Sequence, residues 1–459
     1  MSETLTNFIN GKHVAPKSGQ YLDLVEPATG SVIARVPDSN ADDVDAAVKA
    51  AAAAFPAWST TPAIERSRII MRIGALVEAN LGRLAAAESR DTGKPVSFAS
   101  TVDIPRTATN FNAFAAMIIG SASEFHAFEK GGVPGALDVG GFNYTLRKPR
   151  GVAGLISPWN LPLHLLTWKI APAIATGNPV VCKPSEVTPT TSHILCDLLN
   201  EAGIPPGVVN MVHGRGQTAG AALVTHPDVP TISFTGSTPV GKWIGKECGD
   251  RLKRCSLELG GKNPFVVFAD ADLPAALPTA ARAAFANQGQ ICLCGSRLLL
   301  HESIADEFVK HLVTWANQLK PGDPADPATK FGALTGAAHL EKVDSFVKLA
   351  RDLGGRVLAG GARVDPADLP ARCKGGSFYQ PTVIDGLDPT CRVEQEEIFG
   401  PVVTIQRFKT DDEAVALANG TAYGLAATIF TRDLNRAHSV AARIDAGLVW
   451  INCWMVRDL

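Results

Sequence analysis

Short apolar runs alternate with helical stretches through most of this chain, and this alternation limits the folds open to it. Between residues 150 and 260, runs such as PVVCKP and TISFTG are separated by helix-like segments such as TTSHILCDLLNEAG. A second series follows, with PFVVF, RLLLH and GLVWIN among its apolar runs. Parallel sheets with crossover helices produce this pattern, and their strands are apolar throughout because both faces are covered. We therefore predict an α/β protein with two parallel-sheet domains joined near residue 260.

Two further segments indicate how the chain is divided. The Gly-rich stretch FEKGGVPGALDVGGFNYTLRKPRG has alternating apolar positions toward its end, which is typical of a protruding hairpin. The stretch SNADDVDAAVKAAAAAF predicts a helix that is capped by Ser39 or Asn40 and ends at Pro56. The predicted divisions are a first domain of residues 1–127 and 151–260, a hairpin of residues 128–150 and a second domain of residues 261–459.

The composition of the chain excludes several classes of partner. Its 459 residues carry a net charge of -2, so neither the basic surface of a nucleic-acid-binding protein nor an acidic tail is expected. The nine cysteines are an odd number scattered through a long chain, which favours free thiols in a reducing cytoplasm. No apolar run reaches the roughly 18 residues of a membrane helix, and the first residues contain no apolar leader. We expect a cytoplasmic protein that binds a small molecule and neither nucleic acid nor a membrane.

Polar residues follow several of the apolar runs, and ligands bind at the carboxyl ends of strands in open α/β sheets. In FTGSTPVG, Gly236 and Gly241 open a helix whose backbone amides could meet a phosphate, although such a turn also needs Gly for its conformation alone. In VCKPSE, Lys183 and Glu186 could bind the hydroxyls of an adenosine ribose, or could form a solvated pair. A carboxylate there would repel a 2′-phosphate, which favours NAD over NADP.

Three other residues have side chains suited to covalent catalysis. Asn160 in SPWNLP could donate to an oxyanion, although Asn in a Pro-rich turn commonly serves turn geometry. Glu258 in LELGGKNP could be a general base between the domains, or an isolated surface charge. Cys292 in FANQGQICLCGSR could be a nucleophile, or an ordinary buried thiol. A zinc site at Cys292 and Cys294 is disfavoured because this pair supplies only two of four ligands, so no metal is expected.

These motifs occur together and in order, and in combination the chain resembles the aldehyde dehydrogenase superfamily. The motifs that carry the resemblance are SPWNLP, CKPSE, FTGSTPVG, LELGGKNP, FANQGQIC and EEIFGP. The likeness extends from FINGK near the start to GLVWINC near the end, so it covers almost the whole chain. It implies an aldehyde dehydrogenase-like fold, in which a Rossmann-like NAD-binding domain and a catalytic domain are accompanied by an oligomerisation hairpin.

The resemblance also implies a role for each motif residue. Cys292 would attack the aldehyde carbon to give a thiohemiacetal, whose oxyanion is held by Asn160 and the Cys292 backbone amide. Loss of a hydride to NAD would leave a thioester, and Glu258 would activate the water that hydrolyses it to the acid. The residues implied to bind NAD are Trp159, Lys183, Ser185, Glu186, Gly236, Ser237, Gly241, Glu397 and Phe399.

A narrower likeness concerns the substrate. TVDIPR, QICLCGSR and NCWMVRDL are similar to the branch of that family containing 2-aminomuconate and 2-hydroxymuconate semialdehyde dehydrogenases. These substrates carry a carboxylate opposite the aldehyde, and Arg106 and Arg457 match the positions that this branch uses to bind it. A guanidinium can bind a carboxylate bidentately, whereas structural ion pairing or solvent exposure is the other interpretation of both arginines. The resemblance implies NAD-dependent oxidation of a carboxylated semialdehyde, with 2-aminomuconate 6-semialdehyde as the expected substrate.

Several alternatives stay open on the sequence alone. They are 2-hydroxymuconate semialdehyde as the substrate, a general aldehyde dehydrogenase, and a catalytically idle binding protein on the same fold. Relatives continue past the position of Leu459 with a PFGG loop and a terminal strand. We therefore expect part of the substrate-site wall to be absent, together with the strand that pairs with one sheet edge. Either the sequence is incomplete or the protein is shortened. The hairpin resembles the oligomerisation arm of the family, which implies a homodimer or homotetramer.

Overall fold

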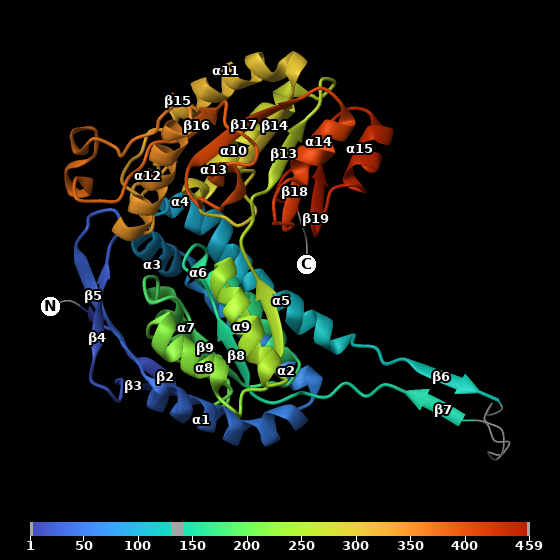
Figure 1. Ribbon diagram of the computed structural model, residues 1–459. Helices are drawn as coiled ribbons and strands as arrows, with labels where there is room; N and C mark the ends of the chain where they lie inside the picture. The colour runs from blue at the N-terminus through green and yellow to red at the C-terminus, as the bar shows by residue number, and fades with distance from the viewer. Residues whose placement is uncertain (1–2, 130–140, 457–459) are drawn as a thin grey trace.

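The computed structural model describes residues 3–129 and 141–456, which form two α/β units and a hairpin that extends from the first unit (Figure 1). The first unit is built on a seven-stranded sheet. In order across this sheet, the strands are β12 (Arg254–Glu258), β11 (Thr231–Thr235), β8 (Ala153–Ile156), β9 (Val180–Lys183), β10 (Val209–Met211), β2 (Asn7–Ile9) and β3 (Lys12–Val14). The pairs from β12 to β10 are parallel, whereas β2 is antiparallel to both of its neighbours.

The second unit is built on another seven-stranded sheet. Its strands, in order, are β15 (Arg356–Ala359), β16 (Thr382–Asp385), β17 (Val402–Phe408), β14 (Arg297–His301), β13 (Pro264–Val267), β18 (Ala426–Phe430) and β19 (Leu448–Ile451). All pairs are parallel except that of β15 with β16. The predicted architecture of two mostly parallel sheets is confirmed.

Helices pack on both sheets. Those of the first unit are α1 (Ala41–Thr60), α2 (Ala63–Ala79), α3 (Leu81–Thr92), α4 (Val96–Phe98), η1 (Ala99–Asp103), α5 (Ile104–Ile119), α6 (Pro162–Ala175), α7 (Thr190–Glu201), η2 (Gly216–Gly220), α8 (Ala221–Thr225) and α9 (Thr238–Asp250). Those of the second unit are α10 (Leu273–Phe285), η3 (Ala286–Gly289), α11 (Glu302–Gln318), α12 (Ala337–Asp352), η4 (Pro366–Asp368), η5 (Ala371–Cys373), α13 (Arg392–Gln395), α14 (Asp411–Ala418) and α15 (Leu434–Ala441).

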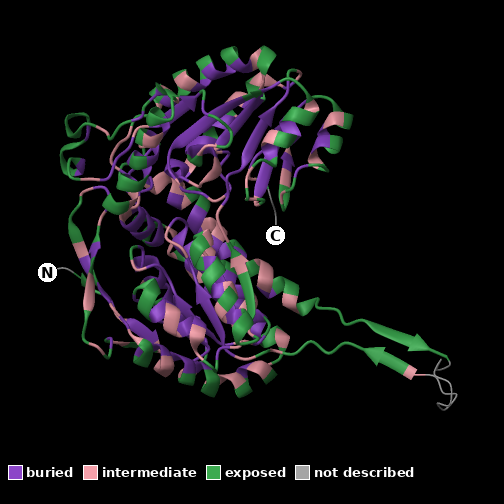
Figure 2. Ribbon diagram, in the orientation of Figure 1, coloured by how far each residue is buried: buried purple, intermediate pink, exposed green. Residues whose placement is uncertain are grey.

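The central strands are apolar because both of their faces are covered. Every residue of β8, β9, β10, β13 and β16 is buried, and Figure 2 shows these strands inside each unit. Alternate residues of one strand enter different cores: Leu155 of β8 packs with the core that contains α2 and α5 residues, and Ile156 packs with the core that contains α1 residues. The continuous apolar runs of the sequence are therefore explained by burial on two sides.

The first long helix begins as predicted but continues past its predicted end. Asn40 caps α1 by accepting hydrogen bonds from the backbone N–H groups of Asp42 and Asp43, at 2.9 and 3.3 Å. Pro56 lies inside the helix, which ends at Thr60, so the prediction that Pro56 ends it is wrong. The last turn is stabilised by Trp58, which is buried and donates from its indole N–H to the carbonyl of Ile174 at 3.0 Å. Tertiary packing thus overrides the unfavourable effect of an internal proline.

Two smaller sheets complete the described fold. A three-stranded sheet is formed by β1 (Glu3–Thr4), β5 (Val32–Pro37) and β4 (Tyr21–Val25), none of which the sequence analysis anticipates. The hairpin consists of β6 (Phe125–Phe128) and β7 (Gly141–Tyr144), and it projects away from both units in Figure 1. It begins before the predicted residue 128, and residues 130–140 of the prediction lie outside the described residues.

Candidate active site

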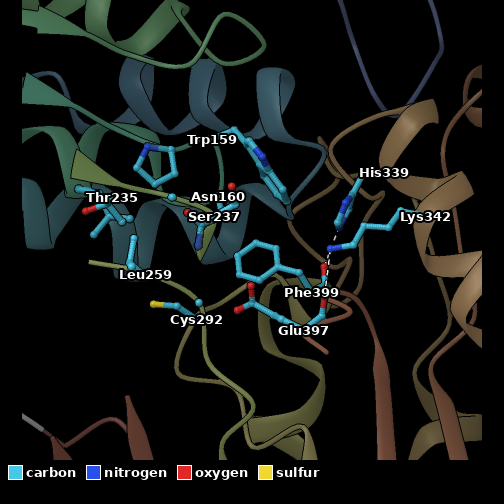
Figure 3. A pocket seen from close by; sticks show the side chains of 14 residues that line it. Trp159, Asn160, Thr235, Ser237, Leu259, Cys292, His339, Lys342, Glu397 and Phe399 are labelled. Atoms are coloured by element: carbon cyan, nitrogen blue, oxygen red, sulfur yellow. Dashed lines mark hydrogen bonds between the residues drawn. The ribbon is translucent and has the colours of Figure 1, made fainter. Parts of the chain in front are cut away.

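A cavity of about 220 Å³ lies between the two units, where strands of the first sheet end (Figure 3). The first unit contributes the segments after β8, β11 and β12, and the second contributes the segment before β14, one turn of α12 and the segment before β17. The lining residues are Pro158, Trp159, Asn160, Leu165, Thr235, Gly236, Ser237, Leu259, Gly260, Cys292, His339, Lys342, Glu397 and Phe399. Some motifs of the sequence predict catalytic residues, and others predict cofactor-binding residues. Residues of both kinds therefore line the same cavity.

Left-handed backbone conformations shape the segment that carries Cys292. After α10, Asn287 and Gln288 adopt φ angles of 49° and 55°. Gly289 follows with φ 71°, and a Cβ atom there would lie 2.0 Å from the carbonyl oxygen of Gly400, so only glycine fits. These residues turn the chain away from the helix axis, and Cys292 then lines the cavity.

The two cysteines of the C-x-C sequence have different surroundings. Cys292 is half-buried and lines the cavity, whereas Cys294 is buried among the apolar residues of the second unit. Burial raises the pKa of Cys294 to about 12, so this thiol stays protonated. The side-chain amide of Asn263 donates to the backbone carbonyls of both cysteines, at 2.7 and 2.9 Å, and fixes the loop between them. Of this pair, only Cys292 is placed to meet a ligand in the cavity.

Asn160 is held at its side chain and at its main chain. Its Nδ2 donates to the carbonyl of Gln290 at 2.9 Å. Its own carbonyl accepts from Lys94 Nζ at 2.8 Å and from Asn287 Nδ2 at 3.2 Å. An amide NH₂ group has two hydrogens, so the second one is available to an oxygen bound in the cavity. The geometry therefore suits Asn160 to stabilise an oxyanion.

Glu258 is not among the residues that line the cavity of Cys292. It is an exposed residue at the end of β12, and it lines a second cavity of about 440 Å³ together with Lys169 and Ser233. Burial lowers the pKa of Lys169 to about 8, although the nearby carboxylate of Glu258 opposes this shift. The structure thus places Glu258 beside a buried lysine and does not bring it together with Cys292 and Asn160.

An aromatic cluster closes one side of the Cys292 cavity. The ring centroid of Trp159 lies 5.0 Å from that of His339 and 5.2 Å from that of Phe399. Phe399 has φ 62°, a strained conformation for a bulky residue, and its carbonyl accepts from His339 Nε2 at 2.7 Å. Burial lowers the pKa of His339 to about 4, so the neutral imidazole makes this hydrogen bond.

Glu397 is fixed by two hydrogen bonds. Its carboxylate accepts from the backbone N–H of Gly261 at 2.9 Å, and its carbonyl accepts from Lys342 Nζ at 3.0 Å (Figure 3). Burial raises the pKa of Glu397, while these donors oppose the shift. A Cβ atom at Gly260 would lie 2.5 Å from the carboxylate, which explains why glycine precedes Gly261. The carboxylate is thereby held at the edge of the cavity.

A third cavity of about 740 Å³ lies beside α8 and α9 and has Glu186 among its lining residues. Lys183 Nζ donates to Glu186 at 2.9 Å, and although burial alone would raise the pKa of Glu186, Lys183 holds it below its usual value. Ser237, at the residue position before α9, lines the Cys292 cavity, whereas Pro239 and Val240 line this third cavity. The amino end of α9 therefore lies between the two cavities, where its free N–H groups can bind an anion.

The predicted glycines and Ser185 contribute in different ways. Gly236 lines the Cys292 cavity, and a Cβ atom there would meet the ring of Phe234 at 2.5 Å. Gly241 is buried in α9 against Leu259, whose side chain a Cβ atom would approach to 2.2 Å, so its glycine serves helix packing. Ser185 is buried after β9 and lines none of these three cavities.

The predicted substrate arginines are not part of the Cys292 cavity as described. Arg106 is half-buried in the first turn of α5, and its guanidinium makes no ion pair or hydrogen bond within residues 3–129 and 141–456. Arg457 lies outside the described residues. The guanidinium of Arg106 therefore has hydrogen-bond donors without a partner among the described residues. Arg106 lies on α5, the helix that follows η1.

Membrane-spanning helices and metal sites are both absent from the described part of the chain. None of its helices is both long enough and apolar enough to span a lipid bilayer. Over the same residues, no group of three or more His, Cys, Asp or Glu side chains could hold a metal ion.

Sequence reasoning missed several residues that line or support the site. His339 and Lys342 lie on α12, which has no motif, and Thr235 and Leu259 are ordinary residues at strand ends. Lys94 is far from Asn160 in the sequence, so only the fold reveals their contact. Lys94 occurs in DTGKPV, which contains no apolar run that would mark the lysine as buried.

Comparison with known proteins places the chain in one family. The sequence pattern of the aldehyde dehydrogenase family matches residues 13–459. The chain is 48% identical to 2-aminomuconic semialdehyde dehydrogenase of Danio rerio, over 99% of this chain and 91% of that protein. It is 46% identical to 2-hydroxymuconic semialdehyde dehydrogenase of Pseudomonas sp. (strain CF600), over 99% and 92% of the two chains.

A solved structure gives the same result for the fold and the cofactor. The crystal structure of PnpE, a protein of Pseudomonas sp. WBC-3, in complex with nicotinamide adenine dinucleotide has a TM-score of 0.94 and 43% identity, and the match covers 99% of this chain and 90% of that one. The expected fold and NAD as the cofactor are confirmed. The chain belongs to the aldehyde dehydrogenase family.

Proposed function

We propose that this NAD-dependent aldehyde dehydrogenase oxidises a semialdehyde that carries a carboxylate away from its aldehyde group. The expected substrate is 2-aminomuconate 6-semialdehyde, and the alternative is 2-hydroxymuconate semialdehyde. Similarity over nearly the full chain to enzymes named for these two kinds of compound supports this proposal. The observation that carries the chemistry is that Asn160 and Cys292, from different units, line one cavity.

Cys292 performs the covalent step in this proposal. Its thiolate forms a bond to the aldehyde carbon, and the carbonyl oxygen becomes an oxyanion that accepts a hydrogen bond from the second Nδ2–H of Asn160. One such donor typically contributes a factor of about 10²–10³ to the rate. When bound, NAD accepts the hydride that the substrate carbon loses. A thioester to Cys292 then remains, and water hydrolyses it to the acid.

Glu258 is proposed as the base that removes a proton from this water. Its side chain makes no hydrogen bond or ion pair with the described residues, and it is exposed, so rotation meets little resistance. Its backbone carbonyl accepts from Gly236 N–H at 3.0 Å, which keeps the end of β12 next to the Cys292 cavity. In this proposal, rotation of the side chain brings the carboxylate of Glu258 toward the thioester.

The residues present fit a dinucleotide. The 740 Å³ cavity beside α8 and α9 is large and mostly apolar, as an adenine site requires, and the Lys183 and Glu186 pair at its edge can bind ribose hydroxyls. The amino end of α9 lies between this cavity and that of Cys292, at the place for a pyrophosphate. Trp159, Glu397 and Phe399 would then border the nicotinamide half.

Arg106 and Arg457 are proposed to bind the distant carboxylate of the substrate. The unused guanidinium donors of Arg106 support its part in this role. We predict that Arg106→Ala raises KM at least about tenfold for a carboxylated semialdehyde, since a charge-assisted hydrogen bond is worth about 1.5–3 kcal/mol. The KM for an uncharged aldehyde serves as the control and should change less than about twofold. Equal increases for both aldehydes would remove Arg106 from this role.

Steady-state kinetics test the substrate proposal. The value of kcat/KM with NAD is compared for 2-aminomuconate 6-semialdehyde, 2-hydroxymuconate semialdehyde and an uncharged aldehyde. The proposal expects the first of these to be highest and the uncharged aldehyde to be lowest. A preference for the uncharged aldehyde would instead identify a general aldehyde dehydrogenase, and no oxidation of any of them by folded protein would support an idle binding protein.

The protein is further proposed to be a cytoplasmic homodimer or homotetramer that assembles through its hairpin. Aromatic side chains on β6 and β7 are largely exposed, with Phe125 at 68%, Phe142 at 73% and Tyr144 at 68%. Exposed aromatic groups of this kind mark interaction surfaces. A second copy of the chain is the partner that the likeness to the family's oligomerisation arm supports.

A further inference from the structure

A lysine is completely buried beneath the Cys292 cavity. Lys94 has no exposed surface, and its ammonium contacts the carboxylate of Asp103, which is equally buried. Glu88, also buried, lies 3.9 Å from the same ammonium. Lysine is almost never buried unless it is paired, because taking its charge out of water costs several kcal/mol. A charge at this depth therefore calls for an explanation.

Stability alone does not explain this cluster. Replacing a buried ion pair by apolar residues of similar volume is often neutral or stabilising. One carboxylate oxygen of Asp103 also lacks any hydrogen-bond partner among the described residues, which is unfavourable for folding. Burial raises the pKa of both acids, that of Glu88 to about 8, and Asp103 is the one in direct contact with the ammonium. Glu88 lies farther from the ammonium, so Asp103 is the acid that Lys94 binds directly.

The fold brings Lys94 and Asp103 together from neighbouring segments. Gly93 ends α3 in the left-handed conformation, with φ 78°, and this turn directs Lys94 inward. Asp103 is the last residue of η1, a π-helical turn that leads into α5. Such turns are rare and are frequent at functional sites. The end of α3 and the end of η1 therefore lie close together, next to Asn160 in the segment that follows β8.

The ammonium is directed at Asn160. Lys94 Nζ donates to the carbonyl oxygen of Asn160 at 2.8 Å, and Asn287 Nδ2 donates to the same oxygen at 3.2 Å. Asn287 also donates to the carbonyl of Gln290 at 3.2 Å, the oxygen to which Asn160 Nδ2 donates. The main chain and the side chain of Asn160 are thus tied to the segment that carries Cys292.

We propose that Lys94 and Asp103 are positioning residues, which hold the peptide of Asn160 so that its Nδ2 group meets the oxyanion formed at Cys292. Neither residue lines the cavity, so they act through Asn160. This role rests on the proposed function, in which Asn160 is the oxyanion donor. Misplacement of a donor by about 1 Å can cost a factor of about 10² in rate, so loss of the buried support should slow the chemical step.

A double-mutant cycle tests this role. The rate constant of NADH formation in a single turnover, at saturating NAD and aldehyde, is measured for the full-length protein and for Lys94→Met, Asn160→Ala and the double variant. Lys94→Met is expected to lower the rate constant by about 10- to 100-fold and to change the aldehyde KM less than about twofold. In the Asn160→Ala background, Lys94→Met should lower the rate constant less than about twofold, because the side-chain amide that Lys94 positions is absent.

Asp103→Asn is measured in the same cycle, since it keeps the side-chain volume if Lys94→Met does not fold. We expect it to slow NADH formation about tenfold in the parent and hardly at all in the Asn160→Ala background. Asp91→Asn is the matched control, because Asp91 is an equally buried carboxylate that instead binds the N–H and hydroxyl of Thr190 at 2.8 and 2.9 Å. This control should stay within about twofold of the parent.

The results separate failure of the positioning role from failure of the proposed function. Full, additive losses from Lys94→Met or Asp103→Asn in the Asn160→Ala background would overturn the positioning role. So would an equal loss from Asp91→Asn, because general destabilisation would then explain the effect. An unchanged rate constant in Asn160→Ala itself would instead overturn the role of Asn160 in the proposed function.

Discussion

Cys292 and Cys294 are two positions apart in the sequence, yet their surroundings give them different chemistry. Cys292 lines a cavity shared by both units, while Cys294 packs in an apolar core where burial raises its pKa to about 12. A thiol of that pKa carries almost no thiolate at neutral pH, and the thiolate is the nucleophile. The difference follows from the turn at Asn287 to Gly289, which decides which of the two side chains faces the cavity.

We predict that Cys292→Ala lowers kcat by at least about 10³-fold, whereas Cys294→Ala changes it less than about threefold. The first variant removes the nucleophile, and the second removes only one buried sulfur atom. Iodoacetamide labelling followed by peptide mass spectrometry provides an independent check, with Cys292 labelled first in the parent. Comparable activity of the two variants, or faster labelling of Cys294, would contradict this assignment.

His213 gives a prediction about acid stability. It is fully buried after β10, neither ring nitrogen has a hydrogen-bond partner among the described residues, and burial lowers its pKa to about 3. The unfolded chain binds a proton near pH 6.5, so between about pH 6.5 and 3 the unfolded state holds more protons and stability falls as the pH is lowered. The loss is about 1.4 kcal/mol per pH unit in that range.

The variant His213→Gln removes this titration while keeping a polar side chain of similar length. Its Tm is expected to fall less than that of the parent between pH 7.5 and pH 5, as measured by differential scanning fluorimetry. At pH 5 the difference between the two proteins corresponds to about 2 kcal/mol. An identical fall in both proteins would show that His213 is not responsible for the acid sensitivity.

At the scale of elements, the sequence predicts best where burial is two-sided. The strands β8, β9, β13, β14 and β18 coincide with runs that are mostly apolar, and the helices between them have clear apolar periodicity. The short strands β1 to β5 were missed because most of their residues are exposed or half-buried, so no apolar run marks them. The prediction at Pro56 was wrong because the unfavourable effect of this proline on the helix is offset by the packing of Trp58. Trp58 contacts Ile174, which is 116 residues away in the sequence.

The site was predictable only in part, for a similar reason. Asn160, Cys292, Glu397 and Phe399 belong to motifs at the ends of elements, and the fold places all four on one cavity. Supporting residues such as His339 and Lys94 act through long-range contacts that no local pattern encodes. The position of Glu258 was also not predictable, since it depends on the exposed edge strand β12.

The hairpin carries a prediction about assembly. The rings of Phe125 and Phe142 lie 6.4 Å apart on neighbouring strands and are both exposed. We predict that the double variant Phe125→Ser, Phe142→Ser has a lower molar mass than the parent by light scattering, because the apolar contact between copies is lost. Leu434→Ser, which changes a residue that is 71% exposed on α15, is the control and should keep the parent mass. A monomeric parent, or an equal effect of both changes, would contradict hairpin-mediated assembly.

At the scale of the whole molecule, the reactive cavity exists only because the two units meet. The first unit supplies Asn160 and the amino end of α9, and the second supplies Cys292 and the segment of Glu397 and Phe399. Hydrogen bonds join the units at this place, from Asn160 to Gln290 and from Asn287 to Asn160. The proposed nucleophile, the proposed oxyanion donor and the proposed dinucleotide site therefore meet at one interface.

The most direct test of this account is NADH formation in a single turnover, with folded full-length protein in excess over a carboxylated semialdehyde and with saturating NAD. We expect one NADH for each aldehyde from the parent and from Cys294→Ala, and none from Cys292→Ala. Formation of NADH at the parent rate by Cys292→Ala, or no NADH from the folded parent, would contradict it.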